Sequence, residues 1–255
     1  MMAARAFEGK AALITGGTAG IGLAIAERLA RDGARVVVTG RDEARGRAAE
    51  ERLGAGARFV AADAADEDDV ERSVGAALAT TGRLDVLVNN AGIALFERLV
   101  DTPVAEFDRL MSANVRGGFL YARACMPALT DTRGSMVHIA SDAGLRGEQA
   151  IGAYSVTKAA MIMLSKMLAL DGAAAGVRSN CVCPGTTAPG MIHIGPASDP
   201  ERGDDASTWP LAPIGRVGCA DDVAGAVAYL AGDEASFVSG AVLLVDGAMG
   251  AGLVA

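Results

Sequence analysis

Three side chains that could exchange a proton with a carbonyl oxygen lie close together near the middle of the chain. Residues 141–158 read SDAGLRGEQAIGAYSVTK and supply the hydroxyl of Ser141, the phenol of Tyr154 and the ammonium of Lys158. The apolar run that follows, AAMIMLSKMLAL, has the composition of a buried helix. Because residues four apart on a helix share a face, we expect Tyr154 and Lys158 to be neighbours.

A neighbouring ammonium would make this tyrosine a useful acid and base. A free phenol titrates near ~10 and is a poor base at neutral pH. A unit charge about 4 Å away, in an effective dielectric of ~20, is worth roughly 4 kcal/mol. We therefore expect the pKa of Tyr154 to lie near ~7, so that it could protonate a ketone or deprotonate an alcohol. The same spacing is common on solvated helix surfaces, so the rest of the chain must decide.

Apolar segments with strand character alternate with segments of helical periodicity along most of the chain. This alternation predicts an α/β fold, a three-layer doubly wound parallel sheet of about seven strands with helices on both faces. Ligands bind such a sheet in a crevice at the carboxyl ends of its strands. The strand-like segments are 10–15, 34–40, 57–63, 84–92, 134–141, 177–185 and 241–247, and the segment 103–129 reads as one long helix.

No linker or repeat divides the sequence, so we predict a single domain over residues 1–255. Residues 186–213 lack periodicity and are rich in Pro, Gly and Asp, which is typical of a loop that covers a substrate. Further candidates for the substrate wall are Leu95, Phe96, Leu145, Arg146, Trp209 and Leu211.

Composition argues against several classes of function. The 255 residues are 51% apolar and carry a net charge of −8, which argues against a nucleic-acid partner. Without a leader-like N-terminus or a run of about 18 apolar residues, we expect a cytoplasmic protein with no membrane partner. The only two histidines accompany four cysteines, which predicts reduced thiols and no metal site; the cysteines are Cys125, Cys181, Cys183 and Cys219.

The first strand-like segment is followed at once by the glycine-rich turn TGGTAGIG at 15–22. Its glycines follow the pattern G-x-x-x-G-x-G and open the first helical segment. A tight turn with free amides at a helix N-terminus suits a dinucleotide pyrophosphate, and an ordinary glycine-rich loop is the alternative. The position after the first strand favours the dinucleotide site, with contacts from Gly16, Thr18, Gly20, Ile21 and Gly22.

The end of the second strand-like segment indicates which dinucleotide is bound. An acidic residue there bonds the ribose 2′-hydroxyl of NAD, whereas an arginine accommodates the 2′-phosphate of NADP. Here Gly40 takes the place of the acid and Arg41 follows, and a guanidinium can bind phosphate in bidentate fashion. We therefore predict a preference for NADP(H). NAD(H) stays possible, because a small loop shift could bring Asp42 to the ribose.

With these segments in place, nearly the whole chain resembles the short-chain dehydrogenase/reductase family in its one-domain, Rossmann-fold form. In that family a hydride passes directly between nicotinamide and a ketone or secondary alcohol, without a metal. The resemblance rests on the joint order and spacing of TGGTAGIG at 15–22, Asp63 after the third strand, NNAG at 89–92, Asn114 in the long helix, Ser141, Tyr154 with Lys158, and Pro-Gly at 184–185.

The resemblance implies a role for each catalytic motif. Tyr154 would be the general acid/base, and Lys158 would lower its pKa and bind the nicotinamide ribose. Ser141 would donate a hydrogen bond to the substrate oxygen, and Asn114 would hold a water against the lysine in a proton relay. Further cofactor contacts would come from Asp63 and Ala64 near the adenine, from Asn90, Ala91 and Gly92 along the ribose, and from Pro184, Gly185 and Thr187 near the nicotinamide.

The chain departs from the family pattern at two positions. Pro189 stands where a threonine often bonds the nicotinamide carboxamide, so this anchor weakens unless Thr186 or Thr187 substitutes. Ala248 replaces the second glycine of the C-terminal V-D-G-G motif, which we expect to affect subunit packing more than chemistry.

The substrate class depends on weaker features. Many relatives reduce 3-oxoacyl groups on an acidic acyl carrier protein, and docking such a carrier requires positive charge. The positions that look equivalent to the family's docking arginines read Thr132 and Ala175, although Arg133 is adjacent. We therefore rank a free ketone or secondary alcohol above the substrate of a 3-oxoacyl-[acyl-carrier-protein] reductase.

The remaining expectations concern two alternative functions and the assembly of subunits. An NAD-dependent secondary alcohol dehydrogenase is another alternative, and a non-catalytic nucleotide sensor is disfavoured by the intact catalytic motifs. By resemblance, the long helix and the Tyr154 helix form one subunit interface and the last helix and strand a second, which implies a homotetramer of D₂ symmetry. Arg109, Arg116 and Arg123 recur every seven residues on the long helix and are expected to make salt bridges between subunits.

Overall fold

The computed structural model of the protein describes residues 6–188 and 209–252. Its centre is a sheet of seven parallel strands, as predicted, and their order is β3–β2–β1–β4–β5–β6–β9. The central strands are buried on both faces, which explains their continuous apolar runs. The strands are β1 (Ala11–Ile14), β2 (Arg35–Gly40), β3 (Ala57–Ala61), β4 (Val86–Asn89), β5 (Ser135–Ile139), β6 (Arg178–Pro184) and β9 (Val242–Val245).

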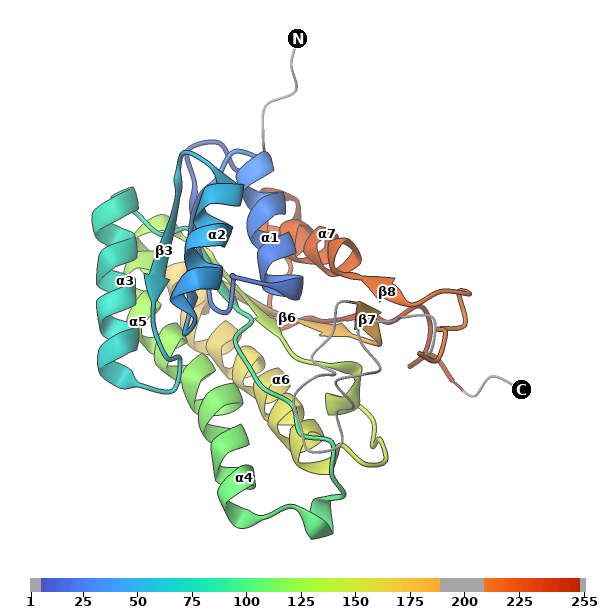
Figure 1. Ribbon diagram of the computed structural model, residues 1–255. Helices are drawn as coiled ribbons and strands as arrows, with labels where there is room; N and C mark the ends of the chain where they lie inside the picture. Colours follow the sequence, from blue (N-terminus) through green and yellow to red (C-terminus); the bar gives the residue numbers. More distant parts are fainter. Residues whose placement is uncertain (1–5, 189–208, 253–255) are drawn as a thin grey trace.

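Helices cover both faces of this sheet (Figure 1). Ala12 and Ile14 of β1 pack in the cluster beneath α1, α2 and α7, whereas Leu13 packs in the cluster beneath α3, α5 and α6. This alternation is the period of two of a strand. The helices are α1 (Gly20–Arg31), α2 (Glu43–Leu53), α3 (Glu67–Thr81), α4 (Val104–Leu110), α5 (Gly117–Thr132), α6 (Gly152–Gly172) and α7 (Ala220–Ala231).

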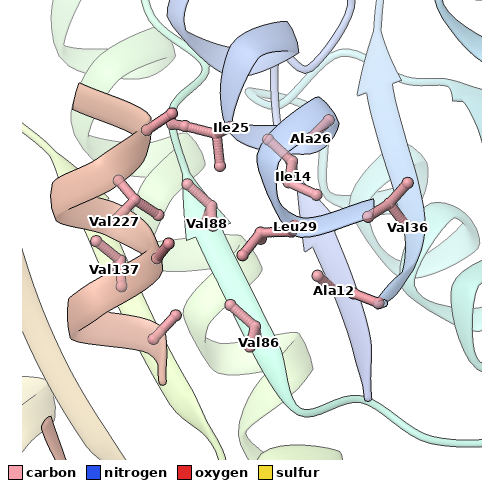
Figure 2. Packing of buried hydrophobic residues seen from close by; sticks show 14 of the residues in the cluster. Ala12, Ile14, Ile25, Ala26, Leu29, Val36, Val86, Val88, Val137 and Val227 are labelled. Atoms are coloured by element: carbon pink, nitrogen blue, oxygen red, sulfur yellow. The ribbon is translucent and has the colours of Figure 1, made fainter. Parts of the chain in front are cut away.

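The layer beneath α1 and α7 is a continuous aliphatic core (Figure 2). Ile25 and Leu29 of α1 and Val227 of α7 are fully buried with Val88 of β4 and Val137 of β5. Burial of one such side chain contributes about 1.5–3 kcal/mol. The end of β1 and the start of α1, which the glycine turn joins, are therefore held firmly.

The strand order reverses between β1 and β4. The chain runs from β1 through α1 to β2 on one side, while β4 pairs with the other edge of β1 and leads to β5. Loops that leave these two strand ends diverge and open a crevice between them. The glycine turn and the NNAG segment leave from these two ends.

The helix predicted over 103–129 contains a π-helical turn. Helices α4 and α5 are joined by Met111–Arg116, and α4 continues α5 beyond the sheet (Figure 1). Apolar periodicity does not reveal a single widened turn, so the sequence predicted one uninterrupted helix.

A second, two-stranded parallel sheet lies beside the first. It pairs β7 (Thr187–Ala188) with β8 (Gly218–Cys219). Strands of two residues show no periodicity, so the sequence did not predict them. The predicted substrate loop starts at this sheet, and its residues 189–208, including Pro189, lie outside the described residues.

By length and composition alone, one helix in the described part of the chain could cross a membrane. It is α6 with the turn that follows it, Gly152–Ala175. The helix packs along β5 and β6 and buries Thr157, Lys158 and Ser165. A core helix of a globular protein passes the same test, so this finding is weak evidence for a membrane span.

Candidate active site

The carboxyl ends of the strands enclose two adjoining cavities. The larger, of about 570 Å³, extends from the glycine turn to Tyr154, and the smaller, of about 330 Å³, lies at the end of β2. Of the predicted site residues, the larger cavity is lined by Gly16, Gly20, Ile21, Gly22, Asn90, Ala91, Gly92, Ser141, Tyr154, Lys158, Pro184, Gly185 and Thr187, and the smaller adds Thr18, Arg41, Asp63 and Ala64. Asn114 is buried behind the wall, against Gly92.

The glycine turn approaches itself so closely that side chains are excluded from it. Gly16 and Gly20 have φ angles of +63° and +53°, which glycine adopts without strain. A Cβ on Gly22 would lie 2.2 Å from the carbonyl oxygen of Gly16. Helix α1 starts here without a side-chain cap, so its first amides are available to an anion. This cradle fits a dinucleotide pyrophosphate.

Thr15 and Asn90 hold the two loops of the crevice together. The hydroxyl of Thr15 accepts hydrogen bonds from the amides of Asn90 and Ala91 at 3.0 and 2.9 Å. The side-chain amide of Asn90 donates to the carbonyls of Thr15 and Gly16 at 3.0 and 3.1 Å. The side chain of Asn90 therefore stabilises the glycine turn. Thr15 was not predicted, although it is the first residue of the glycine motif.

Two guanidinium groups line the smaller cavity at the end of β2. They belong to Arg41, which was predicted, and Arg45, which was not. Asp42 caps α2: its carboxylate accepts the amide of Arg45 at 3.0 Å and pairs with the Arg45 side chain at 3.0 Å. These contacts, the backbone bond above all, lower the pKa of Asp42. An aspartate at a helix N-cap bonds to the amide of the residue three positions later. The N-cap pattern at Asp42 could therefore have predicted that Arg45 lies beside it.

Ser141 and Tyr154 both line the larger cavity. Ser141 follows β5 and caps a short turn, Asp142–Gly144, by accepting the amide of Ala143 at 3.2 Å. Its hydroxyl donates to Asp142 Oδ1 at 3.1 Å. Tyr154 lies in the first turn of α6 and lines the same cavity as Ser141.

The prediction that Lys158 lowers the pKa of Tyr154 is wrong for this structure. Burial raises the pKa of Tyr154, the nearby hydroxyl of Ser141 opposes the rise, and the carboxylates of Asp142 and Glu148 add to it. Lys158 Nζ lies 5.4 Å from the centre of the phenol ring and donates to the carbonyl of Ile139 at 2.9 Å. The ammonium is therefore engaged by the backbone of β5.

Lys158 is itself shifted by its surroundings. Only 3% of the residue is exposed, and this burial lowers the pKa of its ammonium to about 8. The phenol and the ammonium are both displaced toward their uncharged forms.

The side chain of Asn114 joins the π-helical turn to the catalytic helix. Its Oδ1 accepts the amide of Ile93 at 2.7 Å, and its Nδ2 donates to the carbonyl of Ile93 at 2.8 Å. Nδ2 also donates to the hydroxyl of Thr157 at 2.9 Å, which donates in turn to the carbonyl of Tyr154 at 2.7 Å. The amide of Asn114 is thus occupied by protein groups.

The segment after β6 is anchored by the small sheet. Thr187 pairs with Gly218, and its hydroxyl donates to the carbonyl of Gly185 at 3.0 Å. The amide of Gly218 donates to the carbonyl of Thr186 at 3.0 Å. These bonds fix the wall of the larger cavity opposite the glycine turn.

Two residues of the site have no sequence signal that we recognised. A Cβ on Gly144 would lie 2.7 Å from the carbonyl carbon of Lys158, so a glycine is required where the Asp142–Gly144 turn presses on α6. Glu148 lines the larger cavity from the loop before α6. Both positions depend on tertiary contact.

Other predicted residues have mixed outcomes. Phe96 lines the larger cavity, but Leu95 is buried in a separate cluster with Leu110. Leu145, Arg146, Trp209 and Leu211 line neither cavity. All four cysteines are free, and the described residues contain no cluster that could hold a metal.

The arginines of the long helix pair with carboxylates of the same chain, and the predicted salt bridges between subunits stay a prediction. Arg109 pairs with Glu106 at 2.7 Å on its own helix. Arg123 and Arg116 reach Glu67 of α3 at 2.9 and 3.9 Å.

Comparisons with known proteins agree with this geometry. Residues 16–249 match the family model described as Enoyl-(Acyl carrier protein) reductase. The chain is 40% identical over 243 residues to 2-(S)-hydroxypropyl-CoM dehydrogenase 3 of Xanthobacter autotrophicus, covering 92% of this chain and 94% of the relative. It is 37% identical over 243 residues to L-fucose dehydrogenase of Bos taurus, covering 94% and 89%. The crystal structure of 3-ketoacyl-(acyl-carrier-protein) reductase from Brucella melitensis, complexed with NADH, superposes with a TM-score of 0.87 at 33% identity, covering 96% of this chain and 99% of that chain.

Proposed function

The chain belongs to the short-chain dehydrogenase/reductase family, and we propose that it prefers NADP(H) and acts on a free ketone or secondary alcohol with Tyr154 as general acid/base. The observation that carries this proposal is the meeting of Ser141, Tyr154 and Lys158 in one cavity that continues into a glycine-lined cradle. We also propose that the chain is a single domain, because both cavities lie at the edge of one sheet.

In this proposal the nicotinamide supplies or accepts the hydride at the substrate carbon. During alcohol oxidation the phenolate oxygen of Tyr154 takes the hydroxyl proton, and during ketone reduction the phenol returns it. Ser141 turns its hydroxyl from Asp142 toward the substrate oxygen and stabilises charge that develops there. Lys158 would donate to the cofactor ribose. Asn114 positions α6 through Thr157 and is proposed to keep a relay water at the lysine.

The preference for NADP(H) is supported by the charges at the end of β2. Gly40 offers no carboxylate, and Asp42 is engaged as the cap of α2. Arg41 has no ion-pair partner among the described residues, and Arg45 stands beside it. An NAD-dependent alcohol dehydrogenase is the second candidate, because the solved relative is complexed with NADH.

A homotetramer is part of the proposal. Helices α5 and α6 expose Phe119, Met163, Met167 and Leu170, where one subunit interface is expected. Tyr229 of α7, Phe237 and Leu244 of β9 are exposed where the second is expected.

One experiment tests both the reaction and the cofactor. Turnover is measured on a panel of ketones with NADPH or NADH and of secondary alcohols with NADP⁺ or NAD⁺, for wild type and Tyr154→Phe. Dissociation constants for NADPH and NADH are measured on wild type, Arg41→Ala and Arg45→Ala. We expect Tyr154→Phe to abolish turnover and keep cofactor binding, and wild type to bind NADPH at least about tenfold tighter, a margin of ~1.4 kcal/mol that both arginine variants reduce.

The outcomes separate the alternatives. Equal binding of NADH, with indifferent arginine variants, contradicts the NADP(H) preference and favours the NAD-dependent dehydrogenase. No turnover of any panel member by wild type, with cofactor binding intact, contradicts the catalytic proposal.

A further inference from the structure

Four charged side chains line the larger cavity, and two of them belong to its cofactor and proton-transfer parts. Arg45 also lines the smaller cavity and pairs there with Asp42. Lys158 is buried and donates to the carbonyl of Ile139. Of the residues that the structure describes, the other two are Asp142 and Glu148, and both are acidic.

Asp142 is fully engaged by protein groups. Arg146 donates to its Oδ2 at 2.7 Å, while the hydroxyl of Ser141 and the amide of Ala143 donate to its Oδ1 at 3.1 and 2.8 Å. The residue is only 5% exposed. Its charge is therefore balanced by Arg146, which in turn is not free to bind a ligand.

Among the described residues, Glu148 is the carboxylate of this cavity without a close partner. Its nearest cation within residues 6–188 and 209–252 is Arg146 at 3.8 Å, which is too long for a hydrogen bond. Its side chain is 45% exposed, and the desolvation that remains, together with the neighbouring Asp142, raises its pKa. The same cavity is also lined by the apolar residues Ala94, Phe96 and Ile151. A carboxylate in such surroundings has acceptor capacity that a ligand can satisfy.

We propose that Glu148 selects the substrate by charge: the cavity takes a ketone or secondary alcohol that carries an ammonium or a second hydroxyl near the reacting carbon. Substrates with a carboxylate, sulfonate or phosphate in that place are disfavoured by the like charge. The inference rests on the proposed function, because it assumes that the reacting oxygen lies at Ser141 and Tyr154. Glu148 is a specificity residue and exchanges no proton with the substrate.

The test uses three secondary alcohols built on the same four carbons: 4-amino-2-butanol, 1,3-butanediol and 3-hydroxybutyrate. Their kcat/KM values are measured with NADP⁺ and NAD⁺ for wild type, Glu148→Gln and Glu234→Gln. Where an alcohol is not turned over, its dissociation constant from the enzyme with oxidised cofactor replaces kcat/KM. Glu234 is an exposed carboxylate beside the C-terminus of α7. Glu234→Gln therefore removes the same charge as Glu148→Gln, but at a residue that does not line the cavity.

We expect wild type to favour the amino alcohol over the hydroxy acid by at least about tenfold, with the diol between them. Glu148→Gln should reduce that ratio about tenfold while Glu234→Gln leaves it unchanged. A ratio at or below one in wild type, or one that Glu148→Gln does not change, overturns the inference. The proposed function is judged separately, because it fails only if wild type oxidises no secondary alcohol or Tyr154→Phe retains turnover.

Discussion

Burial shifts the pKa values of Tyr154 and Lys158 in opposite directions, and both shifts favour the uncharged form of the side chain. It raises the pKa of the phenol and lowers the pKa of the ammonium to about 8. Each group is therefore displaced toward its uncharged form. Sequence spacing correctly made the two residues neighbours, but it could not show that the ammonium bonds to Ile139. The direction of a pKa shift depends on that contact.

A buried histidine lies inside the sheet, and the sequence did not predict its burial. His138 of β5 is fully buried between Asn89 of β4 and Ser179 of β6, at 3.2 and 3.1 Å. The amide of Asn89 must point its nitrogen at the carbonyl of Gly118, at 3.0 Å, and so offers His138 Nδ1 a donor. Nδ1 is therefore the unprotonated nitrogen, and burial lowers the pKa of His138 to about 4.

This shift predicts a loss of stability in acid. Below the ordinary histidine pKa of ~6.5 the unfolded chain takes up a proton that the folded protein refuses until about pH 4. The free energy of unfolding should therefore fall between these two values, by about 3 kcal/mol in total, and His138 should contribute no pH dependence above them. Urea unfolding between pH 4 and 8 should show this slope reduced in His138→Gln. If His193→Gln reduces the slope and His138→Gln does not, the pH dependence belongs to His193 and the prediction is contradicted.

Ala248 shows why the family pattern has glycine at this position. Its φ of +76° lies in the left-handed region, in a turn that Asp246 holds by accepting the amides of Ala248 and Gly250 at 3.0 and 2.7 Å. Backbone strain is thus an effect within the chain, separate from the subunit packing that the sequence suggested.

Relieving that strain should stabilise the protein. A left-handed residue with a Cβ costs about 1–2 kcal/mol, partly offset by the greater freedom of glycine in the unfolded chain. We expect Ala248→Gly to raise the free energy of unfolding by roughly 0.5–1 kcal/mol and the Tm by about 2 °C. Ala105→Gly, at an exposed position of α4, should act in the opposite direction. Thermal unfolding of both variants decides whether strain or packing matters at position 248.

Helices and strands determine how accurately the reacting groups meet. The Asp142–Gly144 turn carries Ser141 at its start and rests on the backbone of α6 at Lys158 and Ala159. A Cβ at Gly144 would lie 2.7 and 2.9 Å from that backbone, so the turn and the helix would have to separate. Separation would move Ser141 away from Tyr154.

We therefore expect Gly144→Ala to lower kcat by roughly 10–100-fold, because misplacement of about 1 Å can cost that much. Dinucleotide affinity should change little, since the glycine turn is elsewhere. Gly147→Ala is the matched control: it lies in the same loop, and a Cβ there meets nothing within 4 Å. Steady-state kinetics and NADPH binding on both variants test this, and equal losses in the two would contradict the steric explanation.

Elements with long apolar runs or strong turn chemistry were predictable from the sequence. The buried strands β1, β4 and β5 and the turn around Gly16 and Gly22 are of this kind, because their residue types are dictated locally. The π-helical turn, the β7–β8 pair, Gly144 and Glu148 were not predictable, because each is defined by what it contacts across the fold. The sequence thus predicted the proton-transfer groups of the candidate site but not the residues and turns that hold them in place.

At the scale of the whole molecule, α6 has an apolar face on which no described residue packs. Met163, Met167 and Leu170 are 55%, 48% and 71% exposed along α6, and Phe119 of neighbouring α5 is 45% exposed. The arginines of the long helix already pair with Glu106 and Glu67 of the same chain. Any association through this face should therefore depend on apolar burial.

A carboxylate introduced into this face should break the assembly. In a two-fold symmetric interface Met167→Glu places the same new charge on both subunits, and each would lose its water on association. We expect the proposed tetramer to fall to dimers held by the second interface, and the Tm to decrease because catalytic helix α6 loses its cover. Sedimentation velocity at micromolar concentration measures the first effect. Val100→Glu, which changes a 79% exposed apolar residue outside these helices, should leave the assembly intact. If Met167→Glu sediments like wild type, this face of α6 is not the interface, and its apolar residues require another partner.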